Sequence, residues 1–203
     1  MNRRINPVKE LRENQIKEAA LQLFSEKGFY GTTITGIAEA AGLGKGTIYW
    51  YWKSKEELAF SLVEDMLSAF LELIEAASDE GGGFWERFSK LVKGVADLYV
   101  VKKEHCRLLW KFRADRHYIF DPDYTGKVTA YYVRIREAIA DLIRQGIESG
   151  ELRDVDPRLA AYILLGITEG LEIEWLENED DFDLEKGLEM VFSNLYQGLK
   201  KDH

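Results

Sequence analysis

A short stretch in the first quarter of the chain gathers side chains that donate hydrogen bonds or present flat rings. They are Lys45, Thr47, Tyr49, Trp50 and Tyr51. Gly46 lies among them and has no side chain, so the backbone there can come close to a bound molecule. Lysine, hydroxyl and aromatic groups suit contacts with phosphate groups and with base edges in a duplex. The stretch is therefore a candidate nucleic-acid-binding surface.

Two short helices are expected to position this stretch. Thr33 can cap the first, which runs to Ala40, and Gly42 can make the turn before the second, which covers residues 45–51. A longer amphipathic helix with apolar residues at helical spacing precedes them and ends before Gly28. This order is the layout of a helix-turn-helix DNA reader, although the same short aromatic helices could also form the packed end of a helical bundle.

The remainder of the chain is also predicted to be helical. A capping box at residues 54–57 starts a long helix near Lys55, and further segments of helical period cover residues 84–103, 105–117, 122–150 and 157–176. A last segment follows an acidic loop at residues 178–183. Only three prolines occur and no segment alternates like a strand. We therefore predict an all-α fold of about nine helices, of which the first three form the helix-turn-helix domain.

The charge of the chain first argues against a nucleic-acid ligand. With 27 Lys or Arg and 36 Asp or Glu, the formal net charge is −9, whereas binding to phosphates needs basic residues. The charge is unevenly placed, however. Residues 1–55 hold nine basic and five acidic residues, and residues 56–203 hold 18 and 31. The acidity therefore belongs to the second part, and the basic part remains suited to DNA.

The first quarter of the chain carries a family resemblance. The run at residues 32–58, TTITGIAEAAGLGKGTIYWYWKSKEEL, closely resembles the N-terminal signature of the TetR/AcrR family of transcriptional regulators. The run at residues 20–29, ALQLFSEKGF, resembles the first helix of that family and its exit. Two departures are Gly44, where the family usually has a serine cap, and Trp52, where it usually has phenylalanine. Glycine caps a helix almost as well as serine does.

The resemblance assigns roles to nine residues in DNA binding. Thr33 would cap its helix and touch phosphate, Thr35 would lie near DNA, and Trp50 occupies a variable position. The residues expected at base edges are Lys45, Gly46 and Thr47, and those expected at phosphates are Tyr49, Tyr51 and Lys55.

The resemblance also divides the chain by function. Residues 1–55 would be the DNA-binding domain, and residues 56–203 a helical domain for ligand binding and dimerisation. The resemblance implies a homodimer on a pseudo-palindromic DNA operator, acting as a repressor that an unknown small molecule releases. The fourth helix is the expected lever, because it begins at the edge of the DNA-binding domain and passes beside the predicted pocket. A helical carrier or scaffold that binds small molecules without DNA is the alternative function.

Two sets of residues are candidates for the dimer and the ligand. Apolar residues on more than one face of the last two helices predict a dimer interface, or else ordinary core packing: Ile163, Ile167, Leu171, Leu188, Val191, Phe192 and Leu195. Aromatic residues with scattered polar groups predict a ligand pocket, or else plain core: Tyr99, Trp110, Arg113, His117, Tyr131, Tyr132 and Glu169. Arg113 and His117 would favour an anion and Glu169 a cation, so the ligand charge stays open.

Other chemistry finds no support in the sequence. No nucleophile motif, catalytic carboxylate pair or phosphate loop occurs, so we expect neither an enzyme nor a cofactor. The spacing of His105, Cys106, Asp115 and His117 matches no common metal site. The lone cysteine fits a reducing compartment, no secretory signal is visible, and the longest apolar run, residues 159–167, is shorter than the roughly 20 residues of a membrane span. We expect a cytoplasmic protein.

Overall fold

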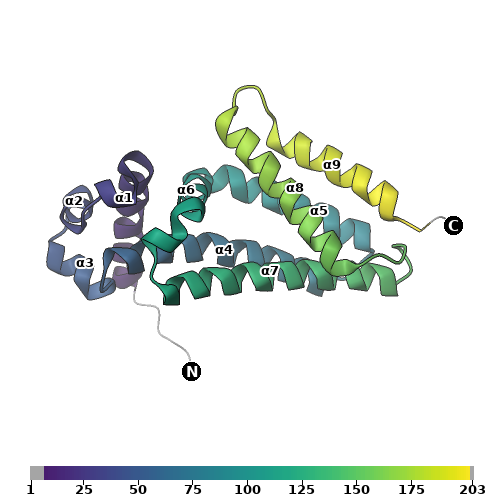
Figure 1. The fold of residues 1–203 in the computed structure, drawn as a ribbon, viewed down its shortest axis with the longest axis horizontal. Helices are drawn as coiled ribbons and strands as arrows, with labels where there is room; N and C mark the ends of the chain where they lie inside the picture. The colour runs from purple at the N-terminus through teal and green to yellow at the C-terminus, as the bar shows by residue number, and fades with distance from the viewer. Residues whose placement is uncertain (1–6, 202–203) are drawn as a thin grey trace. The chain divides into compact units, whose positions relative to one another are not determined.

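The computed structural model describes residues 7–201, apart from the side chains of Pro7 and Ala114 (Figure 1). Within this part of the chain nine helices are found and no strand, which confirms the predicted all-α fold. They are α1 (Pro7–Gly31), α2 (Ile34–Ala40), α3 (Lys45–Tyr51), α4 (Lys55–Asp79), α5 (Phe84–Val101), α6 (Lys103–Ile119), α7 (Pro122–Glu148), α8 (Pro157–Glu177) and α9 (Leu184–Leu199). None of the described helices is both long and apolar enough to cross a membrane.

Local capping sets several of these boundaries. The Asp156 carboxylate accepts hydrogen bonds from the amides of Arg158 (2.9 Å) and Leu159 (3.2 Å) at the start of α8, and Asp183 accepts one from Lys186 (3.1 Å) at the start of α9. A carboxylate at a helix N-terminus satisfies amides that have no partner within the helix. α1 is interrupted at Gly28, whose φ of 70° is not helical.

The described chain divides into two compact units. The first contains residues up to Met66 together with Glu104–Val128, and the second contains Leu67–Lys103 with the residues from Thr129 onward. The first part of α4 thus belongs to one unit and its remainder to the other. The predicted boundary at Lys55 does not coincide with this division, and as a functional boundary it stays a prediction.

A cluster of aromatic rings forms part of the core of the first unit. Phe24 and Phe29 of α1 both pack on Phe112 of α6, with ring centroids 5.8 and 6.0 Å apart. Phe112 also packs on Phe120 (5.8 Å), which meets Phe60 of α4 (6.4 Å). Two hydrogen bonds add to this packing: Tyr30 Oη donates to the Tyr118 carbonyl (2.9 Å) and Lys111 Nζ to the Ser25 carbonyl (2.6 Å). α6 is therefore packed against α1 inside one unit.

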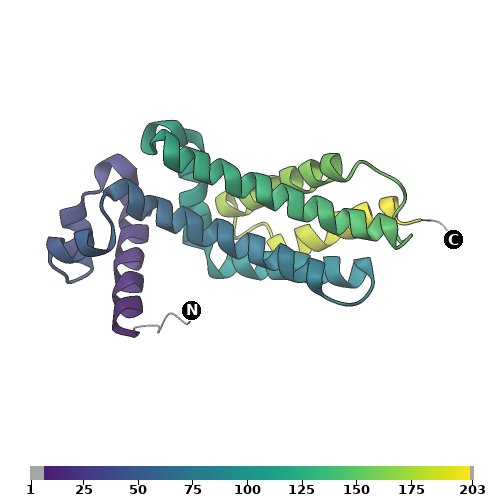
Figure 2. The same cartoon turned by 90° about the horizontal axis from the view of Figure 1, so that it is seen from below.

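The second unit is a bundle of long helices, of which α4 and α7 run in the same direction (Figure 2). Ser68 donates to Tyr131 Oη (3.2 Å) between these two helices. α5 packs against α9, where Phe88 and Phe192 meet edge to face at 5.6 Å.

One charged side chain is buried in the second unit. Arg87 of α5 is only 7% exposed. Its Nη1 donates to Gln145 Oε1 (2.6 Å) and to the Ser78 carbonyl near the end of α4 (3.3 Å). The C-terminal ends of α4 and α7 carry partial negative charge, which offsets part of the cost of burying the guanidinium.

Candidate DNA-binding site

Three features build the helix-turn-helix. Thr33 caps α2 as predicted, because its hydroxyl accepts from the Gly36 amide (3.0 Å). The turn follows with Gly42 at φ +64°, a conformation that favours glycine. The side-chain Nε2 of Gln15 in α1 donates a hydrogen bond to the Ala41 carbonyl (2.6 Å), which links the turn to the first helix. Nothing in the sequence pattern points to this role of Gln15.

α3 is anchored by one side chain and presents the others outward. Ile48 is fully buried, whereas Trp50 is 69% and Tyr49 48% exposed. Lys45 Nζ lies over the Tyr49 ring at 5.7 Å. As predicted, Gly44 precedes α3 without a side-chain cap.

None of the nine predicted DNA-binding residues is buried. Six are exposed, namely Thr33, Thr35, Lys45, Gly46, Tyr49 and Trp50. The other three, Thr47, Tyr51 and Lys55, are half-buried. Lys9 of α1, to which no sequence pattern points, places its Nζ over the Trp50 ring at 5.8 Å and adds a cation beside α3.

Lys55 has internal partners that the sequence does not reveal. Its Nζ donates to the carbonyls of Phe29 (2.7 Å) and Thr32 (2.9 Å) and lies 4.1 Å from the Phe29 ring centroid. Burial lowers the pKa of Lys55, and the neighbouring Glu56 raises it by less. An ammonium group has three protons, so one remains for an external anion.

The predicted capping box at the start of α4 is present with one difference. The Ser54 hydroxyl accepts from the Glu57 amide (3.1 Å), as expected. The Glu57 carboxylate reaches back to the Lys53 amide, whereas the usual capping box would use the amide of the capping residue itself.

The predicted ligand-pocket residues are divided between the two compact units. Trp110, Arg113 and His117 belong to the first, where the Arg113 guanidinium lies 5.1 Å from the Trp110 ring centroid. His117 is exposed. The other four, Tyr99, Tyr131, Tyr132 and Glu169, belong to the second unit. Tyr99 is buried against Phe70 at 5.1 Å. Whether any of the seven binds a ligand stays a prediction.

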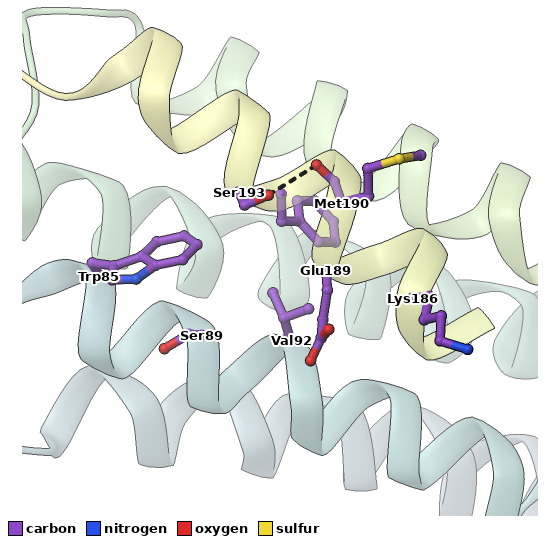
Figure 3. Close-up of a pocket in the computed structure, with 8 residues that line it drawn as sticks. Trp85, Ser89, Val92, Lys186, Glu189, Met190 and Ser193 are labelled. Carbon is purple, nitrogen blue, oxygen red and sulfur yellow. Dashed lines mark hydrogen bonds between the residues drawn. The ribbon is translucent and has the colours of Figure 1, made fainter. Parts of the chain in front are cut away.

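The structure contains a pocket that the sequence analysis did not predict. It lies between α5 and α9 within the second unit and has a volume of about 470 Å³ (Figure 3). It is lined by Trp85, Ser89, Val92, Lys186, Glu189, Met190, Phe192 and Ser193. None of the predicted ligand residues lines it. The lining joins two helices about 100 positions apart in the sequence, a pairing that periodicity within either helix does not indicate.

The predicted dimer residues differ in exposure. Ile163 is 49% exposed, and Ile167, Leu171, Val191 and Leu195 are half-buried. Leu188 and Phe192 are 0% and 5% exposed within the protomer. These two therefore have almost no surface to offer a second chain, and core packing accounts for them. Two exposed residues of α8 that the sequence analysis left out, Leu159 and Tyr162, lie near Ile163.

The described residues contain no cluster of His, Cys, Asp and Glu that could hold a metal ion. Cys106, the one cysteine of the sequence, is fully buried.

Comparison with known proteins covers nearly the whole chain. Residues 16–62 match the family model of bacterial regulatory proteins of the TetR family, and residues 85–199 match that of the C-terminal domain of BetI-type transcriptional repressors.

Individual relatives agree with these matches. The fatty acid metabolism regulator protein of Bacillus subtilis (strain 168) is 25% identical over 186 residues, which cover 91% of this chain and 94% of the relative. The transcriptional regulator AcrR of Shigella flexneri is 30% identical over 181 residues, covering 84% and 81%. The solved structure of the fatty acid degradation regulator FadR from Bacillus halodurans has a TM-score of 0.78 at 22% identity and covers 96% of this chain and 97% of its own. The chain therefore belongs to the TetR family of bacterial transcriptional regulators, and its N-terminal helices are the DNA-binding helix-turn-helix domain of that family.

Proposed function

We propose that this regulator is a homodimeric repressor that places α3 of each protomer in the major groove of a pseudo-palindromic operator and leaves the operator when a small apolar or amphipathic molecule binds. The observation that carries the proposal is the outer face of α3. One isoleucine anchors this helix in the core, while Lys45, Tyr49 and Trp50 remain exposed. Two such helices about 34 Å apart would enter successive major grooves.

The proposed contacts follow from the chemistry of this face. Lys45 and Thr47 are proposed to read base edges, and Gly46 to let the backbone approach the duplex. Tyr49, Tyr51 and the remaining proton of Lys55 are proposed to bind phosphates. Thr33 and Thr35, both exposed, lie at the start of α2, where a phosphate would also meet the helix dipole.

An apolar row on α8 supports the homodimer. Leu159, Tyr162 and Ile163 are exposed, and Gly166 and Gly170 continue the row at helical spacing. A Cβ atom added at either glycine would meet nothing within 4 Å in the protomer. A second α8 can therefore approach this row closely and bury the large side chains beside it. Ile167 and Leu171 flank the row, and Val191 and Leu195 of α9 complete the proposed interface.

The release step is proposed as a shift between two arrangements of the dimer. A ligand changes their populations only by its difference in affinity for the two. α4 is the proposed lever, because this one continuous helix begins next to the DNA-binding helices and contributes residues to both compact units.

A substitution at Gly46 tests the α3 assignment sharply. An alanine Cβ there meets no protein atom within 4 Å, and the position is helical. Gly46→Ala should therefore keep or raise the stability, by about 0.5–1 kcal/mol according to helix propensity. We expect it to weaken operator binding at least tenfold, because the added methyl group occupies the space where the backbone would approach DNA.

The measurement is fluorescence anisotropy on duplexes selected from a random pool, at several salt concentrations, with thermal unfolding of the same samples. Gly126→Ala on α7 is the matched control, because an alanine Cβ there also meets no protein atom within 4 Å and the position is helical. We expect it to leave DNA affinity unchanged. A protein that binds no duplex in a salt-dependent way would instead be a carrier or scaffold. Unchanged DNA affinity in Gly46→Ala would remove α3 from the DNA contact.

A further inference from the structure

The pocket between α5 and α9 is lined in part by aromatic and aliphatic side chains. Val92 and Phe192, which are both buried, line it together with Trp85 and Met190. Trp85 is stacked on Tyr196, with centroids 4.5 Å apart and an interplanar angle of 20°, which fixes the plane of the indole. Figure 3 shows the six-membered part of this indole directed toward α9. A pocket of about 470 Å³ lies in the usual size range for small organic molecules.

The two serine hydroxyl groups that line this pocket can only accept hydrogen bonds from a bound molecule. Ser89 Oγ donates its proton to the Glu86 carbonyl (3.0 Å), and Ser193 Oγ donates its proton to the Met190 carbonyl (3.0 Å). Both oxygens retain lone pairs, so a bound molecule would have to supply the donors. The hydroxyls therefore favour a ligand rich in donors or positive charge.

The two charged residues of the pocket differ in how far they are engaged. Lys186 is paired with Asp183 at 2.8 Å, which raises the pKa of the lysine, and its side chain extends away from Glu189 (Figure 3). The Glu189 carboxylate reaches from α9 toward Val92 of α5 and makes no hydrogen bond or ion pair with any described residue. The net charge offered to a ligand is therefore negative.

We propose that the pocket between α5 and α9 is a binding site for an organic cation with an aromatic or apolar body. The body would lie against Trp85, Val92 and Phe192. The positive group would lie beside the Glu189 carboxylate, since a carboxylate attracts a cation. An organic anion would meet the same carboxylate and no unpaired cation among the lining residues, so it is excluded.

Isothermal titration calorimetry on the full chain without DNA tests this site directly. The probes are (1-naphthylmethyl)trimethylammonium as cation and 1-naphthylacetate as matched anion, at 150 mM salt. We expect one cation bound per chain and no heat from the anion. Glu189→Gln should weaken cation binding about three- to fivefold, the usual range for a partly exposed ion pair. Trp85→Leu should weaken it about tenfold, because the ligand body loses apolar contact area with the indole.

Glu185→Gln is the matched control, because it removes the same charge from an exposed residue on α9 that does not line the pocket. General attraction of cations to an acidic protein would change equally in both glutamine variants, and that result would overturn the proposal. Equal binding of cation and anion, or no binding of either up to millimolar concentration, would overturn it as well. Circular dichroism of each variant separates loss of binding from loss of fold. Since no DNA is present, failure here leaves the proposed DNA binding unaffected.

Discussion

Replacing Lys55 by methionine removes the ammonium group and keeps an unbranched side chain of similar length. The ammonium group donates two hydrogen bonds, to the carbonyls of the buried residues Phe29 and Thr32, and lies over the Phe29 ring. A hydrogen bond from a charged donor contributes about 1.5 kcal/mol at the low end, and a cation–π contact adds about 0.5. The desolvation that lowers the lysine pKa offsets part of this sum. We therefore expect a loss of about 2 kcal/mol in the free energy of unfolding.

The loss is measurable by urea unfolding followed by circular dichroism, and it corresponds to a fall of about 4–8 °C in the melting temperature for a chain of this size. Lys53→Met is the control, since this exposed lysine has no side-chain partner among the described residues. It should change stability by less than about 0.5 kcal/mol. Equal stability of the two variants would refute the inference that Lys55 fastens the end of α1.

The same variant reports on the third ammonium proton. If that proton binds phosphate in each protomer, Lys55→Met should reduce the slope of log affinity against log salt by about 0.9 per protomer, or about 1.8 per dimer. A slope equal to that of the unmodified protein would assign Lys55 to the fold alone.

Three other substitutions follow from the contacts above. Arg87→Leu should lower the free energy of unfolding by about 3 kcal/mol, because Gln145 and the Ser78 carbonyl lose a buried donor; a loss below 1 kcal/mol in urea unfolding would contradict this. Asp183→Asn should be less stable than the unmodified protein near neutral pH, because the hydrogen-bonded Lys186 holds the pKa of Asp183 below its ordinary value. That difference should disappear as pH falls through the lowered pKa, and a difference that persists at pH 2 in thermal unfolding would argue against the ion pair. Tyr124→Phe should reduce the stability lost above pH 10, because burial raises the tyrosine pKa in the folded state; identical alkaline unfolding curves would show that Tyr124 does not contribute.

Local signals were sufficient to predict the helices. The Thr33 cap, the Ser54 capping box and the Asp156-Pro157 start each depend on residues within one turn of each other, so a linear reading finds them. Periodicity indicates which face of a helix is buried, as for Leu188, but it does not indicate which other element packs against that face. The apolar pattern of Leu188 and Phe192 therefore fits either a dimer interface or core packing, and the protomer itself buries both.

The remaining site features depend on residues far apart in the chain. Lys55 bonds to carbonyls 26 and 23 positions away, and Arg87 bonds to a glutamine 58 positions away. The α5–α9 pocket combines side chains from two ends of the second unit's sequence. Such pairings require knowledge of which helices pack together, and nothing in the local pattern supplies it.

The first unit is built from two separate stretches of the chain, and this affects how DNA-binding domains can be exchanged between such regulators. A chimera made by exchanging residues 1–55 alone would separate Phe24 and Phe29 from Phe112, the ring that both contact from α6. The grafted helices would then meet an unmatched aromatic partner, or expose their own rings to water. Specificity swaps between relatives should therefore carry α6 together with α1–α3, because α6 belongs to the same compact unit although it begins about 50 residues after α3 ends.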